Sequence, residues 1–557
     1  MITALHLGNF KAFGEIQRLP IKPLTLVFGP NSSGKSSLIH GLLFARHAFE
    51  TGDLDVNRTT VGGDSVDLGG FGQYVHRRNL ENRVRLRLDF GAPRPVALLQ
   101  ELGNQAPKVS VEIAIGCEVS DRGELLRHGA PRIITVSVSI DDSELMTLSN
   151  RMPATPSQAI LESLLQFEKP KDLGLRGGFR LDRIRLDHPV AKSLLRNFIE
   201  GNTTIQRASP EDIALAEASV DSTIAEFSLQ ASRLLPRKHS TTIDGPLTPD
   251  LVAVRGDRQR ETLEKAFRLY LPRVIGDFLG QIEDGLNELL GALTYLGPLR
   301  SYPPRHLIGL GNDDRNWIAG GAYAWEVVRR NETVRNAVNE WLSSKDRLKT
   351  PYSLRIQRYI APDHAEEVIA DSLRTEEPIE SVDPEELSLG VVNALKSNPS
   401  LERWDELLLR DLRTNTIVSH RDVGIGVSQV LPVLVHAYAD RQRIVAIEQP
   451  EIHLHPALQA DLGDLFIESA LGPNKNTFVL ETHSEHLILR ILRRVRETTE
   501  GNLPDGHCAI RPEDIAVLYT QPSQRGVEVI ELPVTPDGDF GRPWPGGFFA
   551  ERFEDLP

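Results

Sequence analysis

Hydrophobic and polar residues alternate along three early segments of the chain, whereas four other segments are almost wholly apolar. Residues 84–90, 109–115 and 133–140 alternate with a period of two, which predicts half-buried strands of an antiparallel sheet. Strands that are buried on both faces form continuous apolar runs instead. Such runs lie at residues 24–28, 444–448, 477–482 and 515–519. Helical periodicity between the later runs indicates a largely parallel sheet, so we predict an α/β fold with an antiparallel β subdomain.

The middle of the chain has apolar residues at helical spacing, within residues 158–167, 209–235 and 258–295. Prolines interrupt these segments and heptads are not sustained, so we expect a helical insertion over residues 150–290 and no long coiled coil. Helices are also expected near residues 323–343. The acidic residues 363–386 are expected to form a loop or linker.

A turn-rich basic stretch joins these two regions at residues 295–305. It carries Arg300 and Arg305 beside glycine and prolines. The two arginines would line an anion or partner site, or the stretch is an ordinary domain junction; the sequence favours neither alternative.

Composition and charge narrow the class of protein. The chain has 557 residues, of which 40% are hydrophobic, so it can form several sizeable cores. No apolar run reaches the ~18 residues that a membrane span needs. The start lacks the pattern of a signal peptide, and only Cys117 and Cys508 are present, so we expect a cytoplasmic protein without disulfides. The net charge of −14 opposes a globally basic nucleic-acid-binding surface.

Residues 29–36 match the phosphate-loop motif G-x-x-x-x-G-K-S/T, between a predicted strand and a predicted helix. Backbone N–H groups of such a loop bind phosphate oxygens, and the start of the helix favours an anion. Lys35 would contact the β- and γ-phosphates, and Ser36 would bind Mg²⁺. The predicted ATP-binding residues are Gly29, Pro30, Asn31, Ser32, Ser33, Gly34, Lys35, Ser36 and Ser37.

A phosphate loop also needs a second strand that ends in an acid near Mg²⁺. Residues 444–448 provide one, and Glu448 is the predicted metal acid. Glu448 lies 413 residues after Lys35, which is too far for a simple nucleotide-binding domain. We therefore predict that the middle of the chain is inserted into a split nucleotide-binding fold.

Residues 448–456, with the sequence EQPEIHLHP, resemble the D-E-P-x-x-H-L-D block of ABC-type ATPases. Residues 424–429 resemble the family's signature loop, and residues 481–484 resemble its switch-histidine segment. Residues 9–13 resemble the start of RecF and SMC-like heads. The order of these motifs resembles prokaryotic ABC-like ATPases related to the OLD (overcoming lysogenization defect) family, which includes the Septu ATPase subunit. Residues 544–552 resemble the ending of a subfamily of unknown function.

The resemblance implies an organisation in five parts: 1–149, an ATPase lobe with the phosphate loop and β subdomain; 150–290, the helical insertion; 291–412, a junction; 413–533, a second ATPase lobe; and 534–557, a tail. It also implies a dimer in which the signature-like residues Gly424, Gly426 and Ser428 meet the ATP of the other protomer.

The resemblance further implies catalytic roles after the acid strand. The family's catalytic glutamate is replaced by Gln449, an amide that orients water but cannot accept its proton. Glu451 would take the proton, and His483 would contact the γ-phosphate. Slow hydrolysis in a long-lived ATP state is expected. In an alternative, Glu448 itself is catalytic and Gln449 is only its neighbour. Two further departures are a signature that is not L-S-G-G-Q and His455 in place of an aspartate.

Two other kinds of site were weighed against the ATPase. His453, His455, His483 and His486 have spacings that can chelate a metal. Asp537 and Asp539 could form the D-x-D of a Toprim nuclease, although Asp-Gly is a common turn. We favour neither site, and we expect no nuclease activity from this chain alone.

Two functions fit the motifs best. One is the sensor subunit of an anti-phage defence complex, with ATP, Mg²⁺ and a separate effector nuclease as partners. The other is a RecF-like repair ATPase that binds DNA itself. A nucleotide-binding scaffold without useful hydrolysis is a third alternative.

Overall fold

The computed structural model describes most of the chain in several stretches. They are residues 1–91, 107–117, 130–150, 178–185, 188–191, 226–228, 233–236, 257–300, 315–345, 347–360, 362–373, 383–399, 401, 403–418 and 425–545. Within these stretches, no helix combines the length and the apolar character needed to cross a membrane.

An antiparallel sheet of eight strands forms the β subdomain. Its order is β2 (Gln17–Pro20), β1 (Ile2–Gly8), β4 (Val84–Gly91), β5 (Lys108–Gly116), β6 (Arg132–Ile140), β7 (Ser143–Asn150), β8 (Gly178–Ile184) and β9 (Glu226–Ser228). The three segments with alternating patterns are β4, β5 and β6, which pair as neighbours. The predicted antiparallel β subdomain is therefore confirmed.

The second sheet has six strands and carries the phosphate loop. Its order is β10 (Leu293–Leu296), β14 (Ile444–Glu448), β15 (Thr477–Glu481), β3 (Leu24–Phe28), β16 (Ile515–Ser523) and β17 (Gly526–Glu531). The first five strands are parallel, and β17 pairs antiparallel with β16 at one edge. The phosphate-loop strand and the acid strand belong to one sheet, which confirms the split α/β fold.

Two hydrophobic cores lie on opposite faces of this second sheet. On β3, Leu26 and Phe28 face one core and Val27 faces the other. The first core, which includes Val27, contains α1 (Lys35–Thr51). The second core, which includes Leu26 and Phe28, contains α12 (Ile425–Ala439), α13 (Pro456–Leu471) and α14 (Glu485–Glu500). Both faces are covered, which explains the wholly apolar strands.

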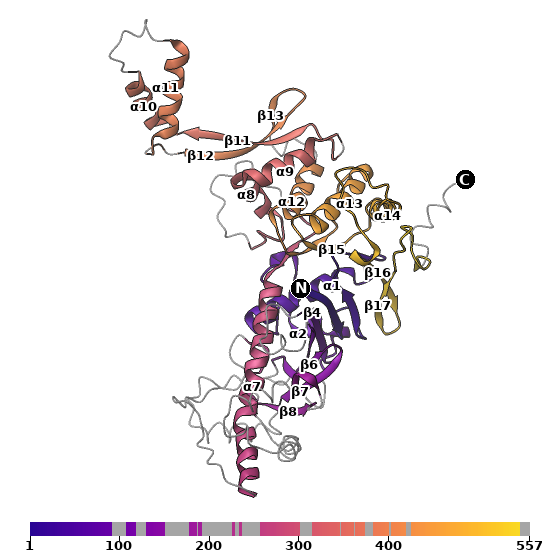
Figure 1. Cartoon of the computed structure of the whole chain (residues 1–557). Coiled ribbons are helices and arrows are strands. Elements are labelled where there is room, and N and C mark those ends of the chain that lie inside the picture. Colours follow the sequence, from indigo (N-terminus) through magenta and orange to yellow (C-terminus); the bar gives the residue numbers. More distant parts are fainter. Residues whose placement is uncertain are drawn as a thin grey trace, which may run out of the picture.

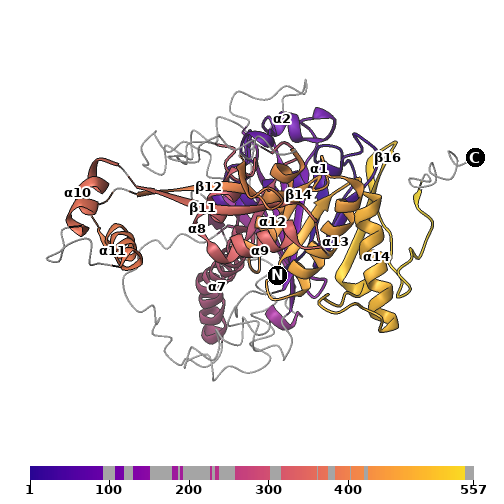
Figure 2. The same cartoon turned by 90° about the horizontal axis from the view of Figure 1, so that it is seen from above.

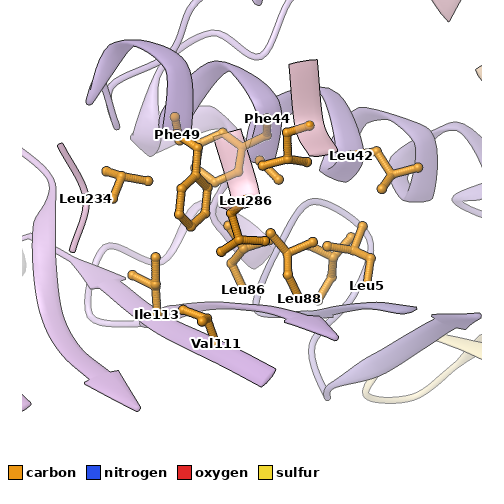
Figure 3. Close-up of a cluster of buried hydrophobic side chains, with 14 of the residues drawn as sticks. Leu5, Leu42, Phe44, Phe49, Leu86, Leu88, Val111, Ile113, Leu234 and Leu286 are labelled. Atoms are coloured by element: carbon orange, nitrogen blue, oxygen red, sulfur yellow. The ribbon is translucent and has the colours of Figure 1, made fainter. Parts of the chain in front are cut away.

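The first core also joins the two sheets. Figure 3 shows Phe44 and Phe49 of α1 beside Leu86 and Ile113 of the antiparallel sheet, with Leu286 in the same cluster. Each such side chain contributes about 1.5–3 kcal/mol when it is fully buried. The helix that follows the phosphate loop is thus held between the sheets.

The chain also contains short helices. They are η1 (Gly63–Ser65), α2 (Phe71–Tyr74), η2 (His76–Arg78) and, near the end of the chain, η6 (Pro512–Asp514).

The predicted helical insertion over residues 150–290 is only partly correct. Its last part is α7 (Asp257–Gly291), a 35-residue helix that runs beside the antiparallel sheet (Figure 1). However, β8 and β9 extend that sheet past residue 150, and β9 lies within the segment predicted as a helix over 209–235. Pairing of β9 with β8 at the sheet edge overrides the local helical pattern. The predicted helix over 158–167 lies outside the described residues.

A two-stranded arm projects from the body in both Figure 1 and Figure 2. It is built from β11 (Tyr352–Ile360) and β12 (Arg403–Asp411), with β13 (Thr416–Val418) beside β12. Its far end carries α10 (Pro362–Ser372) and α11 (Pro384–Ser397). The predicted loop over residues 363–386 is therefore wrong over α10. At the other end, the predicted helices near 323–343 are α8 (Ala322–Arg330) and α9 (Glu332–Ser343), which contact α12.

Candidate nucleotide-binding site

The phosphate loop connects the end of β3 to the start of α1. Gly29 has φ 148° and Gly34 has φ 84°, which are backbone conformations that favour glycine. A Cβ at Gly29 would lie 2.3 Å from Thr520 Oγ1, and one at Gly34 would lie 2.8 Å from the Ala12 side chain. Both glycines of the motif are therefore required by the packing of the loop.

Hydrogen bonds hold the loop in shape. The hydroxyls of Ser33 and Thr520 lie 2.6 Å apart, and Thr520 also donates to the Phe28 carbonyl at 3.1 Å. Lys35 Nζ donates to the carbonyls of Gly29 and Pro30 at 3.0 and 2.8 Å. Burial lowers the pKa of Lys35, and Glu481 and Glu451 oppose that shift. The lysine ammonium is thus held directly over the loop.

A cavity of about 410 Å³ opens in front of the loop, within the size range typical of ligand sites. It is lined by Lys11, Ala12, Asn31, Ser32, Ser33, Gly34, Lys35, Ser36, Ser37, His40, Gln449, Glu481 and His483. Seven of the nine predicted ATP-binding residues line it, whereas Gly29 and Pro30 form the loop wall that receives Lys35. Sequence analysis singled out residues 9–13 as a motif but assigned Lys11 no role.

Two carboxylates end neighbouring strands beside this cavity. Glu448 of β14 and Glu481 of β15 are paired in register, and they are 6% and 4% exposed. Glu448 Oε1 accepts a hydrogen bond from the Tyr295 hydroxyl at 2.9 Å and lies 3.4 Å from His40 Nε2. Glu448 itself is not part of the cavity lining, whereas Glu481 is. The sequence identified the first acid and missed the second.

Glu481 lines the cavity beside the phosphate loop, and the pKa of its carboxyl group is raised. Burial raises the pKa of Glu481 to about 7, repulsion from Glu448 adds to the shift, and a hydrogen bond from the Ser36 hydroxyl opposes it. Oxygen Oε2 of Glu481 is buried and has no hydrogen-bond partner among the described residues. In the sequence, the role of Glu481 in the cavity was indicated only by its position at the end of a predicted strand, two residues before His483.

The predicted catalytic residues separate into two groups. Gln449 and His483 line the cavity, and the Gln449 N–H donates to the Glu481 carbonyl at 2.7 Å. Burial lowers the pKa of His483, and Lys35 adds to that effect. Glu451 is buried and does not line the cavity: its carboxylate accepts hydrogen bonds from Thr482 Oγ1 and the His483 N–H, both at 2.8 Å. Glu451 therefore holds the segment that carries His483. The sequence analysis had instead predicted that Glu451 accepts the proton of the attacking water.

The signature-like residues lie apart from this cavity. Gly424 is outside the described residues, and Gly426 and Ser428 are in the first turns of α12. Gly426 approaches the loop after β14, because a Cβ there would lie 3.2 Å from the His453 carbonyl. Ser428 is only 2% exposed, so its hydroxyl does not face solvent in this protomer. The contact of these residues with the ATP of a second protomer stays a prediction.

Arg300, from the turn-rich basic stretch, connects these elements. It is 6% exposed and donates to the carbonyls of Gln429, Glu448 and Gln449 at 2.9, 3.3 and 3.0 Å. Burial lowers the pKa of Arg300 to about 10, so it stays charged near neutral pH. Residues 295–305 were predicted to form either an anion or partner site or a domain junction. The contacts of Arg300 with backbone carbonyls agree with the domain junction. Arg305 lies outside the described residues.

The two alternative sites find no support. In the described part of the chain, no three His, Cys, Asp or Glu side chains form a group that could hold a metal ion. Asp537 and Asp539 flank Gly538 in a turn that packs against α14. Arg496 donates to the Asp537 carbonyl at 2.7 Å and pairs with Asp539 at 3.3 Å.

Comparison with known families locates a match in the second half of the chain. Residues 321–490 match a family described as "AAA domain, putative AbiEii toxin, Type IV TA system". A curated relative from Halobacterium salinarum, named a DNA double-strand break repair Rad50 ATPase, is 26% identical over 183 residues. This alignment covers 32% of the present chain and 19% of the relative.

Comparison with solved structures finds SMC heads. The SMC head domain from Thermotoga maritima has a TM-score of 0.31 and 8% identity, with 96% of this chain and 99% of that chain covered. The Smc head with a coiled coil and joint from Pyrococcus yayanosii has a TM-score of 0.32 and 12% identity, with coverage of 95% and 97%. The phosphate-loop geometry, the family match and the Rad50 similarity together support a P-loop ATPase.

Proposed function

We propose that this chain binds ATP with Mg²⁺ in the phosphate-loop cavity, hydrolyses it slowly, and acts as a dimeric switch. One observation carries the proposal. A single cavity brings together the phosphate loop, Lys35, Ser36, Gln449 and His483, with a buried carboxylate at its wall. These groups come from the ends of neighbouring parallel strands, where α/β sheets bind their ligands.

The residues of this cavity suit a nucleotide with its cation. The backbone of residues 31–37 offers N–H groups at the start of α1, which favours phosphate. Lys35 would exchange the carbonyls of Gly29 and Pro30 for the β- and γ-phosphates. Ser36 and Glu448 would offer oxygen atoms to the cation, and the carboxylate of Glu481 lies nearby. Oxygen atoms are the ligand type that Mg²⁺ prefers. When bound, the cation would neutralise charge on the phosphates.

We expect slow ATP hydrolysis because the residues that would face the γ-phosphate include no strong proton acceptor. Gln449 would orient the attacking water, which suffices where phosphoryl transfer depends mainly on positioning. Glu451 already accepts two hydrogen bonds from the segment around His483, so we assign it a positioning role. His483 would contact the γ-phosphate as a neutral imidazole, since burial lowers its pKa.

The biological role that we propose is the sensor subunit of a defence complex with a separate effector nuclease. The net charge of −14 and the toxin–antitoxin description of the matched family support this role. The alternative is a repair ATPase that binds DNA directly, and the name of the Rad50 relative is compatible with it. DNA binding by the purified chain with a steep salt dependence would favour the repair role.

Nucleotide binding can be tested with Lys35→Ala. Charge-assisted contacts to phosphate are among the strong ones, so we expect the affinity for ATP with Mg²⁺ to fall at least ~100-fold. Isothermal titration calorimetry measures this affinity. Lys396→Ala, on the exposed face of α11, is the matched control and should bind as the wild type does. Equal affinity in Lys35→Ala and wild type would reject the phosphate-loop assignment.

A further inference from the structure

Glu481 carries a buried oxygen that no described residue satisfies. The residue is 4% exposed, and Oε2 has no hydrogen-bond partner within the described part of the chain. The side chain nevertheless lines the nucleotide cavity. A buried carboxylate without full compensation is costly, because burial removes its hydration. A buried oxygen without a partner, on a residue that lines the cavity, points to a ligand bound beside that residue.

The surroundings of Glu481 specify a cation. The carboxylates of Glu448 and Glu451 both disfavour its charged form, and burial acts in the same direction. Lys35, whose charge opposes this shift, already donates to the carbonyls of Gly29 and Pro30. A divalent cation would relieve the repulsion and coordinate the oxygen that has no partner.

Glu481 lines the same cavity as Ser36, the residue that the motif assigns to the cation. Glu448, in contrast, accepts from Tyr295 and lies beside His40, and it stands outside the cavity lining. Of the two acids, Glu481 is thus the one that lines the cavity together with Ser36.

We propose that Glu481, at the end of β15, supplies a second carboxylate to the divalent cation that accompanies the nucleotide, next to Ser36 and Glu448. The inference rests on the proposed ATP-binding function. It changes the expected site from one acid on one strand to a pair of acids on neighbouring strands. Two carboxylates, a hydroxyl and phosphate oxygens form an all-oxygen set that suits Mg²⁺ or Mn²⁺.

The test is the dependence of nucleotide binding on the cation. Calorimetry of the full chain with ATP, once with Mg²⁺ and once with EDTA, gives the factor by which Mg²⁺ strengthens binding. Loss of a group that only supports a metal ligand already costs 10–100-fold in metal affinity, so Glu481→Gln should reduce this factor at least ~10-fold. With EDTA, Glu481→Gln should bind ATP at least as tightly as the wild type, because one negative charge has been removed.

Two further variants complete the experiment. Glu528→Gln makes the same change on an exposed carboxylate of β17 and should keep the full Mg²⁺ factor. Glu481→Asp keeps the charge on a shorter side chain and should give an intermediate factor, so it replaces Glu481→Gln if that variant does not fold. Circular dichroism checks folding.

The outcomes separate the inference from the function on which it rests. If wild type binds no ATP under either condition, the proposed function fails. If wild type binds ATP with Mg²⁺ and Glu481→Gln keeps the same Mg²⁺ factor, the proposed function stands and the cation assignment is overturned. Loss of hydrolysis with an unchanged Mg²⁺ factor would likewise overturn it, because Glu481 would then act on water.

Discussion

Gln449 is the residue that we propose sets the rate of ATP hydrolysis at this site. It follows the acid strand directly, lines the cavity and has φ 47°. That left-handed conformation is uncommon for a residue other than glycine, and it is held by the N–H bond to the Glu481 carbonyl. The backbone therefore directs this side chain into the site, where an amide can orient water but cannot accept a proton near neutral pH.

Steady-state hydrolysis by Gln449→Glu and Glu448→Gln tests this role. Gln449→Glu adds a proton acceptor at the same place, so its rate should equal or exceed that of the wild type. Glu448→Gln weakens the predicted cation site and should lower the rate at least ~10-fold, which equals ~1.4 kcal/mol of barrier. Gln449→Ala is the third variant. If Gln449→Glu and Gln449→Ala both hydrolyse at the wild-type rate, another residue positions the water.

Residues of the site were predictable where a contiguous motif carries them. The phosphate loop, Glu448, Gln449 and His483 all follow apolar runs that end at the cavity. Thr520 and Glu481 were not assigned, because their roles depend on which strands are neighbours. Thr520 meets Ser33 across 487 residues of chain, and such a contact leaves no local pattern. Glu451 was identified, but its partners on the neighbouring strand end were not.

At the scale of elements, Arg300 joins the start of α12 to the end of β14. Its guanidinium donates to three backbone carbonyls there, and Gln429 Nε2 lies 3.4 Å from the Arg300 carbonyl in return. The helix that begins with the signature-like residues and the strand that ends in the metal acid are thus bound to the same buried side chain. A shift of one element would be transmitted to the other.

Removal of this side chain should destabilise the fold. Arg300→Ala removes the hydrogen bonds from a buried guanidinium to three backbone carbonyls. Hydrogen bonds to charged groups are worth ~1.5–3 kcal/mol each, so we expect a loss of about 3 kcal/mol or more. Urea unfolding measures it. Arg493→Ala removes an exposed i,i+4 pair with Glu497 and should cost only ~0.3–0.5 kcal/mol. Equal losses in the two variants would contradict the structural role of Arg300.

Elements were predictable where burial alone determines the pattern. The apolar strands at 444–448 and 477–482 agree with β14 and β15 to within a residue. The acidic segment after residue 362 was misassigned because its charge resembles a linker, although Pro362 stands at the start of the helix that forms there. Strands β8 and β9 depend on the edge of a sheet made by distant residues, so local helical spacing misled the prediction.

At the scale of the whole molecule, the phosphate-loop cavity and the signature-like residues are separate in one chain. The phosphate-loop cavity contains none of the signature-like residues that the structure describes. The start of α12 instead lies beside the loop after β14, where His453 is exposed with φ 63°. A second protomer can bring this surface to the nucleotide, and that is the arrangement we predict for the ATP-bound dimer.

This dimer can be tested at His453 without disturbing the buried Ser428. In His453→Glu, a carboxylate would face the triphosphate of the other protomer, so the mass gained on addition of ATP and Mg²⁺ should be reduced in light scattering. Gln442→Glu is the matched control, since Gln442 is also exposed, has φ 53° and precedes β14 at its opposite end. That variant should dimerise as the wild type does. If ATP changes the mass of neither the wild type nor the variants, the dimeric switch is wrong; if His453→Glu dimerises fully, the interface lies elsewhere.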